Sequence, residues 1–144
     1  METNKIEEII SAIENLIPEY MKNTADSGIS NGNVALCIID EEGKVFGKLF
    51  GKDKIRSRYS YKIAWTKASQ VWITGTKTGE FEKLVFTKQI DEYKFGISRP
   101  DFIGWEGGQP IILKDGTKLA FGFSGFRGVS DLEIVTKAIL QLDI

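Results

Sequence analysis

Apolar positions at the start of the chain repeat at steps of three and four residues. Six isoleucine and leucine side chains in residues 4–17 follow this spacing, which predicts an amphipathic helix with one wide apolar face. Pro18 either kinks this helix or begins a new turn. Residues 23–33 are rich in Gly, Ser, Asn and Asp, a composition that predicts a loop.

Two hairpins are predicted from shorter apolar runs. Residues 34–39 are apolar on both alternating faces, as in a central strand covered on two sides, and 44–50 follow as a second strand after a polar turn. Residues 111–113 and 118–124 form a second pair in the same way. Gly122 has no side chain to pack, so we expect something to approach its backbone closely.

Helical spacing returns in three further segments. It predicts a helix over 60–74, a short helix over 80–88 and a last helix over 131–142 with Ser130 as its N-cap residue. The stretch 89–110 is irregular, and loops of that length are usually functional or disordered. A chain of 144 residues with this order of elements predicts a single α+β domain over residues 1–144.

Composition removes several kinds of chemistry. The chain has no histidine, so it lacks the commonest metal ligand and the usual general base near neutral pH. Cys37 lies inside an apolar run and is expected to pack as a small hydrophobic residue. The longest apolar run is far shorter than the roughly 20 residues that cross a bilayer, so we expect a cytoplasmic protein without a membrane partner.

Charge is distributed unevenly although the net charge is only −1. Residues 1–43 carry 2 basic and 9 acidic side chains, whereas 44–67 carry 8 basic side chains and one acidic. Such asymmetry fits a solvated surface, a contact between subunits or a site for a small anion. Nucleic acid is not expected, because the pI is about 5.6 and, between residues 52 and 62, only Tyr59 and Tyr61 interrupt the basic segment as stacking residues.

The glycine-rich loop before the second hairpin is a candidate binding segment. Gly107 and Gly108 precede Pro110, and glycine lets backbone amides meet a ligand because it has no Cβ. The alternative is a tight entry into the strand.

A second candidate joins a strand to a helix. Residues 124–128 include Ser124 and Arg127, and free N–H groups at a helix start favour an anion. Lys67 either presents its ammonium at the rim of a cleft or is a solvated lysine. Asp131 is an available carboxylate that also suits the first turn of a helix, and carboxylate catalysis or a metal site would require several such groups to converge.

These segments together resemble a known family. Lys67-Ala68, the run Gly107-Gly108-Gln109-Pro110, the run Gly122-Phe123-Ser124-Gly125 and Asp131 resemble the GlcG/HbpS-like family, also called the haem-degrading or haem-binding family, which includes PduO C-terminal-like domains. The likeness spans about residues 5–142. It implies a profilin-like α/β (α+β) fold with an antiparallel sheet of about five strands flanked by helices, the fifth strand expected between residues 92 and 103.

The resemblance also implies a function and an assembly. It implies a homo-oligomer that binds a small ligand, with haem or a corrinoid as the cofactor class, in a cleft formed by Lys67, Gly107, Gly108, Pro110, Ser124 and Asp131. A chain without histidine would hold such a ligand through Tyr, Met, Cys or oxygen donors, or through the ligand's carboxylates. We therefore expect a binding protein for a tetrapyrrole or another anionic molecule. The alternatives are a non-catalytic oligomeric accessory protein and an enzyme that uses Lys67 or Asp131.

Overall fold

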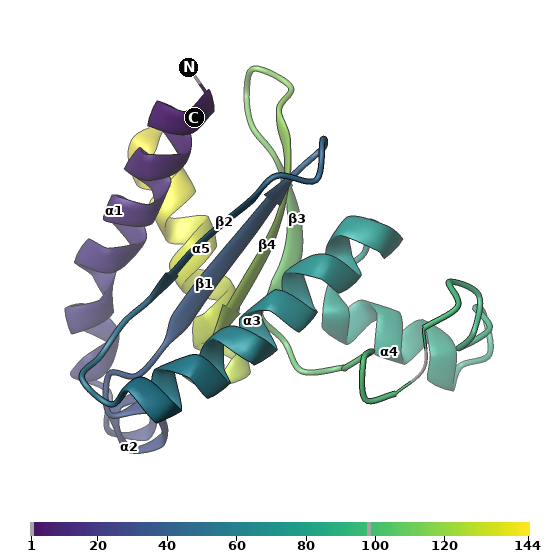
Figure 1. The fold of residues 1–144 in the computed structure, drawn as a ribbon, viewed down its shortest axis with the longest axis horizontal. Helices are drawn as coiled ribbons and strands as arrows, with labels where there is room; N and C mark the ends of the chain where they lie inside the picture. Colours follow the sequence, from purple (N-terminus) through teal and green to yellow (C-terminus); the bar gives the residue numbers. More distant parts are fainter. Residues whose placement is uncertain (1, 98) are drawn as a thin grey trace.

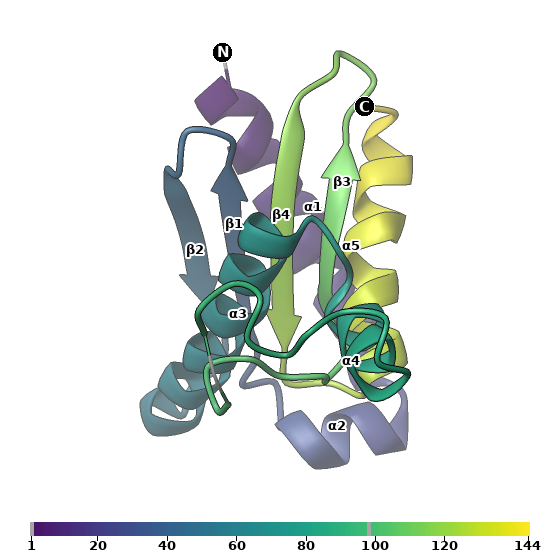
Figure 2. The same cartoon turned by 90° about the vertical axis from the view of Figure 1, so that its right-hand side faces the viewer.

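A four-stranded antiparallel sheet forms the centre of the fold. The structure is a computed structural model that describes residues 2–97 and 99–144. The strands are β1 (Ala35–Asp40), β2 (Val45–Leu49), β3 (Gly108–Ile112) and β4 (Lys118–Ser124), and they lie in the order β2-β1-β4-β3 (Figure 2). The two predicted hairpins are confirmed. They join through antiparallel pairing of β1 with β4, in which Cys37 faces Gly122.

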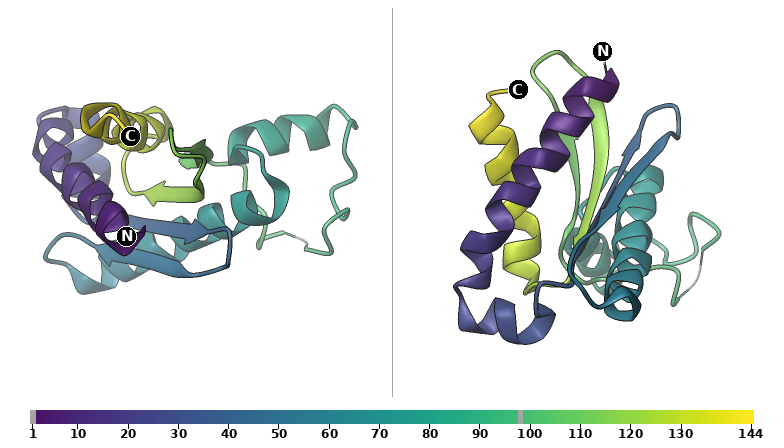
Figure 3. Two further views of the ribbon diagram at one scale, coloured as in Figure 1. Left: turned by 90° about the horizontal axis from the view of Figure 1, so that it is seen from above. Right: turned by 60° about the vertical axis from the view of Figure 1, so that its left-hand side comes forward.

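Helices cover both faces of this sheet. The pair α1 (Glu2–Met21) and α5 (Gly128–Leu142) lies on one face, and α3 (Lys54–Thr74) crosses the other (Figures 1 and 3). The short α2 (Thr24–Ser30) lies at the end of the sheet where β4 stops. The remaining helix, α4 (Thr78–Phe86), and the segment after it extend away from the sheet and the helices that cover it (Figure 1).

The alternating strand positions divide the core into two clusters. Leu36 and Ile38 of β1 pack with side chains of α1, α5 and β4, and Cys37 and Ile39 pack with α3. Cys37 is fully buried, as its sequence context predicts, and burial raises the pKa of its thiol to about 11. Both faces of β1 are therefore core, which explains its uninterrupted apolar run.

Helix α3 lies unusually close to the sheet because the residues between them are small. A Cβ placed on Gly122 would lie 2.0 Å from the carbonyl oxygen of Ala64 and 2.7 Å from the amide nitrogen of Ala68. The close backbone approach predicted at Gly122 is thus confirmed, and the neighbouring backbone is that of α3.

The strand count and the first loop differ from the sequence predictions. The sheet has four strands and not five, and residues 92–97 and 99–103 contain no strand in the described structure. Segment 23–33 is not simply a loop, because it contains α2. Asn23 starts this helix by accepting hydrogen bonds from Ala25 and Asp26 through its side chain, and one short turn without an apolar stripe gives little periodicity to detect.

Helices α3 and α5 begin at least three residues earlier than predicted. Helix α3 begins at Lys54 because the Asp53 carboxylate accepts from the amides of Ile55 and Arg56. Helix α5 begins at Gly128, so Ser130 is not its N-cap residue.

Pro18 lies inside α1 and does not end that helix. No helix within the described ranges is both long and apolar enough to cross a membrane.

Candidate functional site

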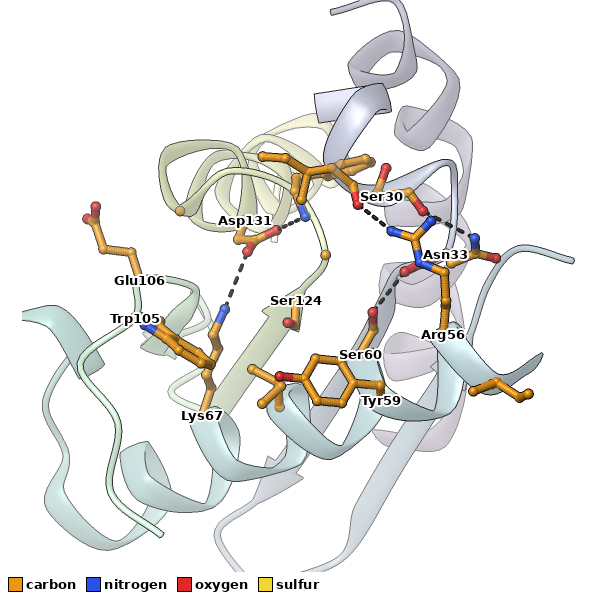
Figure 4. A pocket seen from close by; sticks show the side chains of 16 residues that line it. Ser30, Asn33, Arg56, Tyr59, Ser60, Lys67, Trp105, Glu106, Ser124 and Asp131 are labelled. Carbon is orange, nitrogen blue, oxygen red and sulfur yellow. Dashed lines mark hydrogen bonds and ion pairs between the residues drawn. The ribbon is translucent and has the colours of Figure 1, made fainter. Parts of the chain in front are cut away.

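A cavity of about 680 Å³ opens between α3 and the start of α5 (Figure 4). One wall is a face of α3 on which successive turns contribute Arg56, Ser60, Ile63 and Lys67. The opposite wall is the chain from the end of β4 into α5. The volume falls in the range of about 300–1,000 Å³ that is usual for small-molecule sites. The complete lining is Ile29, Ser30, Asn33, Ile55, Arg56, Tyr59, Ser60, Ile63, Lys67, Trp105, Glu106, Ser124, Gly125, Phe126, Gly128 and Asp131.

A buried ion pair closes the inner end of the cavity. Lys67 Nζ lies 3.3 Å from Asp131 Oδ2 and donates to the carbonyl oxygen of Phe123 at 2.9 Å (Figure 4). The two side chains are only 2% and 3% exposed. The other carboxylate oxygen of Asp131 accepts from the amide of Phe126 at 3.0 Å. Lys67 is therefore not a solvated lysine, and its ammonium lies at the inner end of the cavity and not at the predicted rim. Asp131 does lie in the first turn of its helix.

Burial works against the charge on both members of this pair. It lowers the pKa of Lys67, although the nearby carboxylates of Asp131 and Glu106 counteract it. It also raises the pKa of Asp131 to about 7, although Lys67 and the amide of Phe126 favour the carboxylate. The neutral forms of both groups are thus more accessible here than in water.

The glycine loop lies directly behind the ion pair. A Cβ on Gly107 would lie 2.6 Å from Lys67 Nζ and 3.0 Å from the Cβ of Asp131, and the residue has a φ of 125°. A Cβ on Gly108, the first residue of β3, would lie 3.1 Å from the carbonyl oxygen of Lys67. Glycine at both positions lets this segment contact α3 and α5. The two glycine-rich segments identified in the sequence therefore meet at the inner end of one cavity.

Aromatic side chains form the rim. Tyr59 and Trp105 are 61% and 59% exposed, and both line the cavity. A hydrogen bond anchors the loop that carries Trp105, since Thr78 Oγ1 donates to the carbonyl oxygen of Trp105 at 2.6 Å. The side-chain amide of Gln70 also exchanges two hydrogen bonds with the backbone of Ile103. This anchoring positions a largely exposed indole at the entrance.

Arg127 lies outside the cavity lining. Its guanidinium contacts the buried Asp26 at 3.0 Å, and its own amide donates to the same carboxylate at 2.9 Å. Ser130 Oγ donates to Asp26 Oδ2 at 2.7 Å, which removes it from the N-cap role. Burial opposes the charge of Asp26, but the hydrogen bonds of Arg127 and Ser130 outweigh it and lower the pKa of this carboxyl. Arg127 thereby fastens α2 to α5.

Pro110 lies at a different hollow. This second cavity, of about 570 Å³, lies between β3 and the end of α3 and includes Trp72 and Ile111. Of the residues predicted to form one cleft, the structure brings Lys67, Ser124 and Asp131 to the first cavity and places Gly107 and Gly108 behind it. It does not bring Pro110 there. The ligand-binding role of all seven residues remains a prediction.

Several lining residues were missed at the sequence level. Arg56 and Ser60 lie on the same face of α3 as Lys67. Their spacing of four, three and four residues through Ile63 and Lys67 indicates this face only for a helix that begins near Asp53, and the predicted helix begins at residue 60. Ser30 and Asn33 gave no signal because α2 was not predicted. Among the described residues, no three Cys, Asp or Glu side chains gather as metal ligands, so Asp131 is not part of such a cluster.

Comparisons with known proteins identify the fold. Neither a family model nor a curated protein matches the sequence. Among solved structures, protein ORFY of Klebsiella pneumoniae is similar with a TM-score of 0.67 and 20% identity, over 93% of this chain and 84% of that one. PduOC, solved as a complex with haem, has a TM-score of 0.65 and 17% identity, over 95% and 91% of the two chains.

A third similar structure is a double mutant of HbpS from Streptomyces reticuli. Its TM-score is 0.63 at 18% identity, over 94% of this chain and 84% of that chain. Identities this low establish shared architecture and not shared activity. The chain therefore has the GlcG/HbpS-like fold that its sequence motifs predict.

Proposed function

We propose that this protein is a GlcG/HbpS-like binding protein that holds a flat, anionic organic molecule in the cavity between α3 and α5. The observation that carries the proposal is the combination of a ligand-sized cavity with aromatic groups at its rim and polar groups inside it. Tyr59 and Trp105 provide stacking surfaces, and the hydroxyls of Ser60 and Ser124 lie deeper. Arg56 at the outer end is an exposed cation that donates to the carbonyl oxygen of Ile29, and its other N–H groups can bind an acidic substituent.

The size of the site favours an extended ligand. Arg56 and Lys67 are eleven residues apart on α3, which corresponds to about 16 Å along the helix axis. A molecule that contacts Arg56, Tyr59 and the inner end of the cavity must therefore be long as well as flat. A tetrapyrrole with peripheral carboxylates satisfies this description, and the haem complex of the similar PduOC supports it as a ligand class.

Iron coordination is not the interaction that this cavity favours for a haem. The chain has no histidine, and Lys67 is buried at the closed inner end of the cavity. The cavity's other candidate donors are oxygen atoms, such as those of Tyr59 at the exposed rim and Glu106. We therefore propose that any tetrapyrrole is held through its ring face and its carboxylates.

Titration with haemin and with metal-free protoporphyrin tests this proposal. We expect saturation at one molecule per chain for both compounds with similar affinity, because iron is not needed. Trp105→Ala should weaken binding at least tenfold, and the matched variant Trp65→Ala, whose indole is exposed on α3 away from the cavity, should not. A haemin spectrum that broadens without saturating would remove tetrapyrroles as the ligand, and equal effects of the two variants would show that this cavity is not the binding site.

A second proposal concerns assembly into a homo-oligomer. Glu7, Glu8 and Glu14 are exposed along α1, whereas Lys54 and Arg58 are exposed at the start of α3. Opposite charge on two separate surfaces favours a head-to-tail contact between copies, although Lys48 already pairs with Glu14 within one chain. Sedimentation should give an oligomer at low salt that weakens at high salt, and a monomer under both conditions would refute this assembly. We also propose that the protein is located in the cytoplasm.

A further inference from the structure

The amine at the inner end of the cavity contacts two oxygen atoms. Within the described part of the chain, Lys67 Nζ has two hydrogen-bond acceptors, the carbonyl oxygen of Phe123 and Asp131 Oδ2. A charged ammonium has three N–H donors, whereas a neutral amine has two donors and one lone pair. In its neutral form the amine can donate to both acceptors and still carry a lone pair that can attack a molecule in the cavity.

The surroundings of Lys67 favour that neutral form. The side chain is 2% exposed, and burial lowers its pKa. Asp131, whose pKa burial raises to about 7, is placed to take up and return a proton near neutral pH. Desolvated lysines with these features act as nucleophiles toward carbonyl carbons.

We propose that Lys67 forms a reversible imine with an aldehyde or ketone group of the molecule that occupies the cavity. This inference rests on the proposed binding function, since the carbonyl compound must first enter the site. It defines the ligand class more narrowly, as a flat anion that bears a carbonyl group, and it gives the Lys67–Asp131 pair a chemical role.

The proposed reaction uses only groups already present. The neutral Lys67 nitrogen attacks the carbonyl carbon, so a C–N bond forms while the π bond of the carbonyl breaks, and Asp131 carries one N–H proton to the oxygen to give the carbinolamine. The C–O bond of the carbinolamine then breaks as Asp131 carries the second N–H proton to the hydroxyl, which leaves as water. The C=N bond then forms, and the net change is carbonyl plus amine giving imine plus water. No oxidant or reductant is consumed.

Reductive trapping tests this chemistry. The probe is para-carboxybenzaldehyde at pH 7 with cyanoborohydride, followed by intact mass measurement and peptide mapping. We expect Lys67 to be labelled at least tenfold faster than Lys62, an exposed lysine on the same helix. Lys67→Arg, which keeps a cation beside Asp131, should lose the dominant label, and the matched Lys62→Arg should keep it. Labelling spread over exposed lysines, with Lys67 no faster than Lys62, would overturn the proposal.

A matched alcohol separates this inference from the binding function. The compound para-(hydroxymethyl)benzoate has a similar shape and charge but no carbonyl group, so it reports occupancy alone. We expect it to shift the amide NMR signals of residues 59–67 and 124–131. Such shifts without trapping at Lys67 would overturn the imine and leave the binding function standing. Neither shifts from the alcohol nor trapping at Lys67 by the aldehyde would count against both. The wild-type mapping decides the question even if the Lys67→Arg variant fails to fold.

Discussion

Lys67 and Asp131 meet 3.3 Å apart although they belong to helices on opposite faces of the sheet. The two side chains meet at the end of β4, where the carbonyl oxygen of Phe123 is the second acceptor for the lysine. A buried ion pair contributes little net stability, because the cost of desolvating both charges offsets their attraction. Its position at the inner end of a ligand-sized cavity is better explained by binding or proton transfer than by stability.

The raised pKa of Asp131 predicts a particular pH dependence of stability. Its folded pKa of about 7 exceeds the ordinary value of 3.8, so between about pH 4 and pH 7 the folded chain holds a proton that the unfolded chain has lost. The contribution of Asp131 to the free energy of unfolding therefore falls as the pH rises through this window, by at most about 4 kcal/mol. Asp131→Asn removes that fall.

Urea denaturation of both proteins at several pH values measures the effect. The free energy of unfolding of the wild type minus that of Asp131→Asn should decrease between pH 4 and pH 7. Asp101→Asn changes an exposed carboxylate and serves as the control. A difference that stays constant across the window would show that Asp131 has an ordinary pKa.

The buried carboxylate of Asp26 is predicted to contribute more to folding stability than the exposed carboxylate of Glu19. Replacement by alanine leaves the guanidinium and amide of Arg127 and the hydroxyl of Ser130 without their acceptor. Because Arg127 is 42% exposed and water can solvate it, we expect a loss of about 2–4 kcal/mol. Glu19→Ala, which breaks the exposed pair with Lys137, should cost less than about 1 kcal/mol. Equal losses for the two variants in chemical denaturation would contradict this ranking.

Gly122→Ala should be among the most damaging small substitutions. The added methyl group would lie 2.0 Å from the backbone oxygen of Ala64, so α3 must move away from the sheet. We expect a loss of at least about 1–3 kcal/mol or failure to fold. Gly28→Ala is the matched change, since its methyl group meets nothing within 4 Å in α2 and should stabilise the helix by about 0.5–1 kcal/mol. The melting temperatures of the two variants distinguish a steric clash at Gly122 from a general effect of replacing glycine by alanine.

The sequence predicts the hairpins and main helices well because their periodicity reflects burial directly. The run 34–39 is apolar throughout since both of its faces are covered, and Gly122 is explained by the approach of α3. Helix α2 was missed because its stability derives from a side-chain cap at Asn23 and from contacts of Asp26 with a residue 101 positions away. Local pattern carries no information about such distant partners.

The candidate site could be predicted only in part for the same reason. Lys67 and Asp131 were selected individually, but their pairing depends on how α3 and α5 pack around β4. Arg127 has the composition expected of an anion site, yet Asp26 supplies its partner from within the chain. The rim residue Trp105 lies in a segment without periodicity, and its position depends on a hydrogen bond from Thr78.

Native mass spectrometry of the protein as isolated tests the central claim most directly, because it reports bound small molecules and subunit number together. The account predicts one bound small molecule per chain on the wild type. Trp105→Ala should reduce this adduct at least tenfold, whereas Trp65→Ala should retain it. A wild-type spectrum without an adduct, or an adduct that Trp105→Ala keeps in full, would contradict the assignment of this cavity as the binding site.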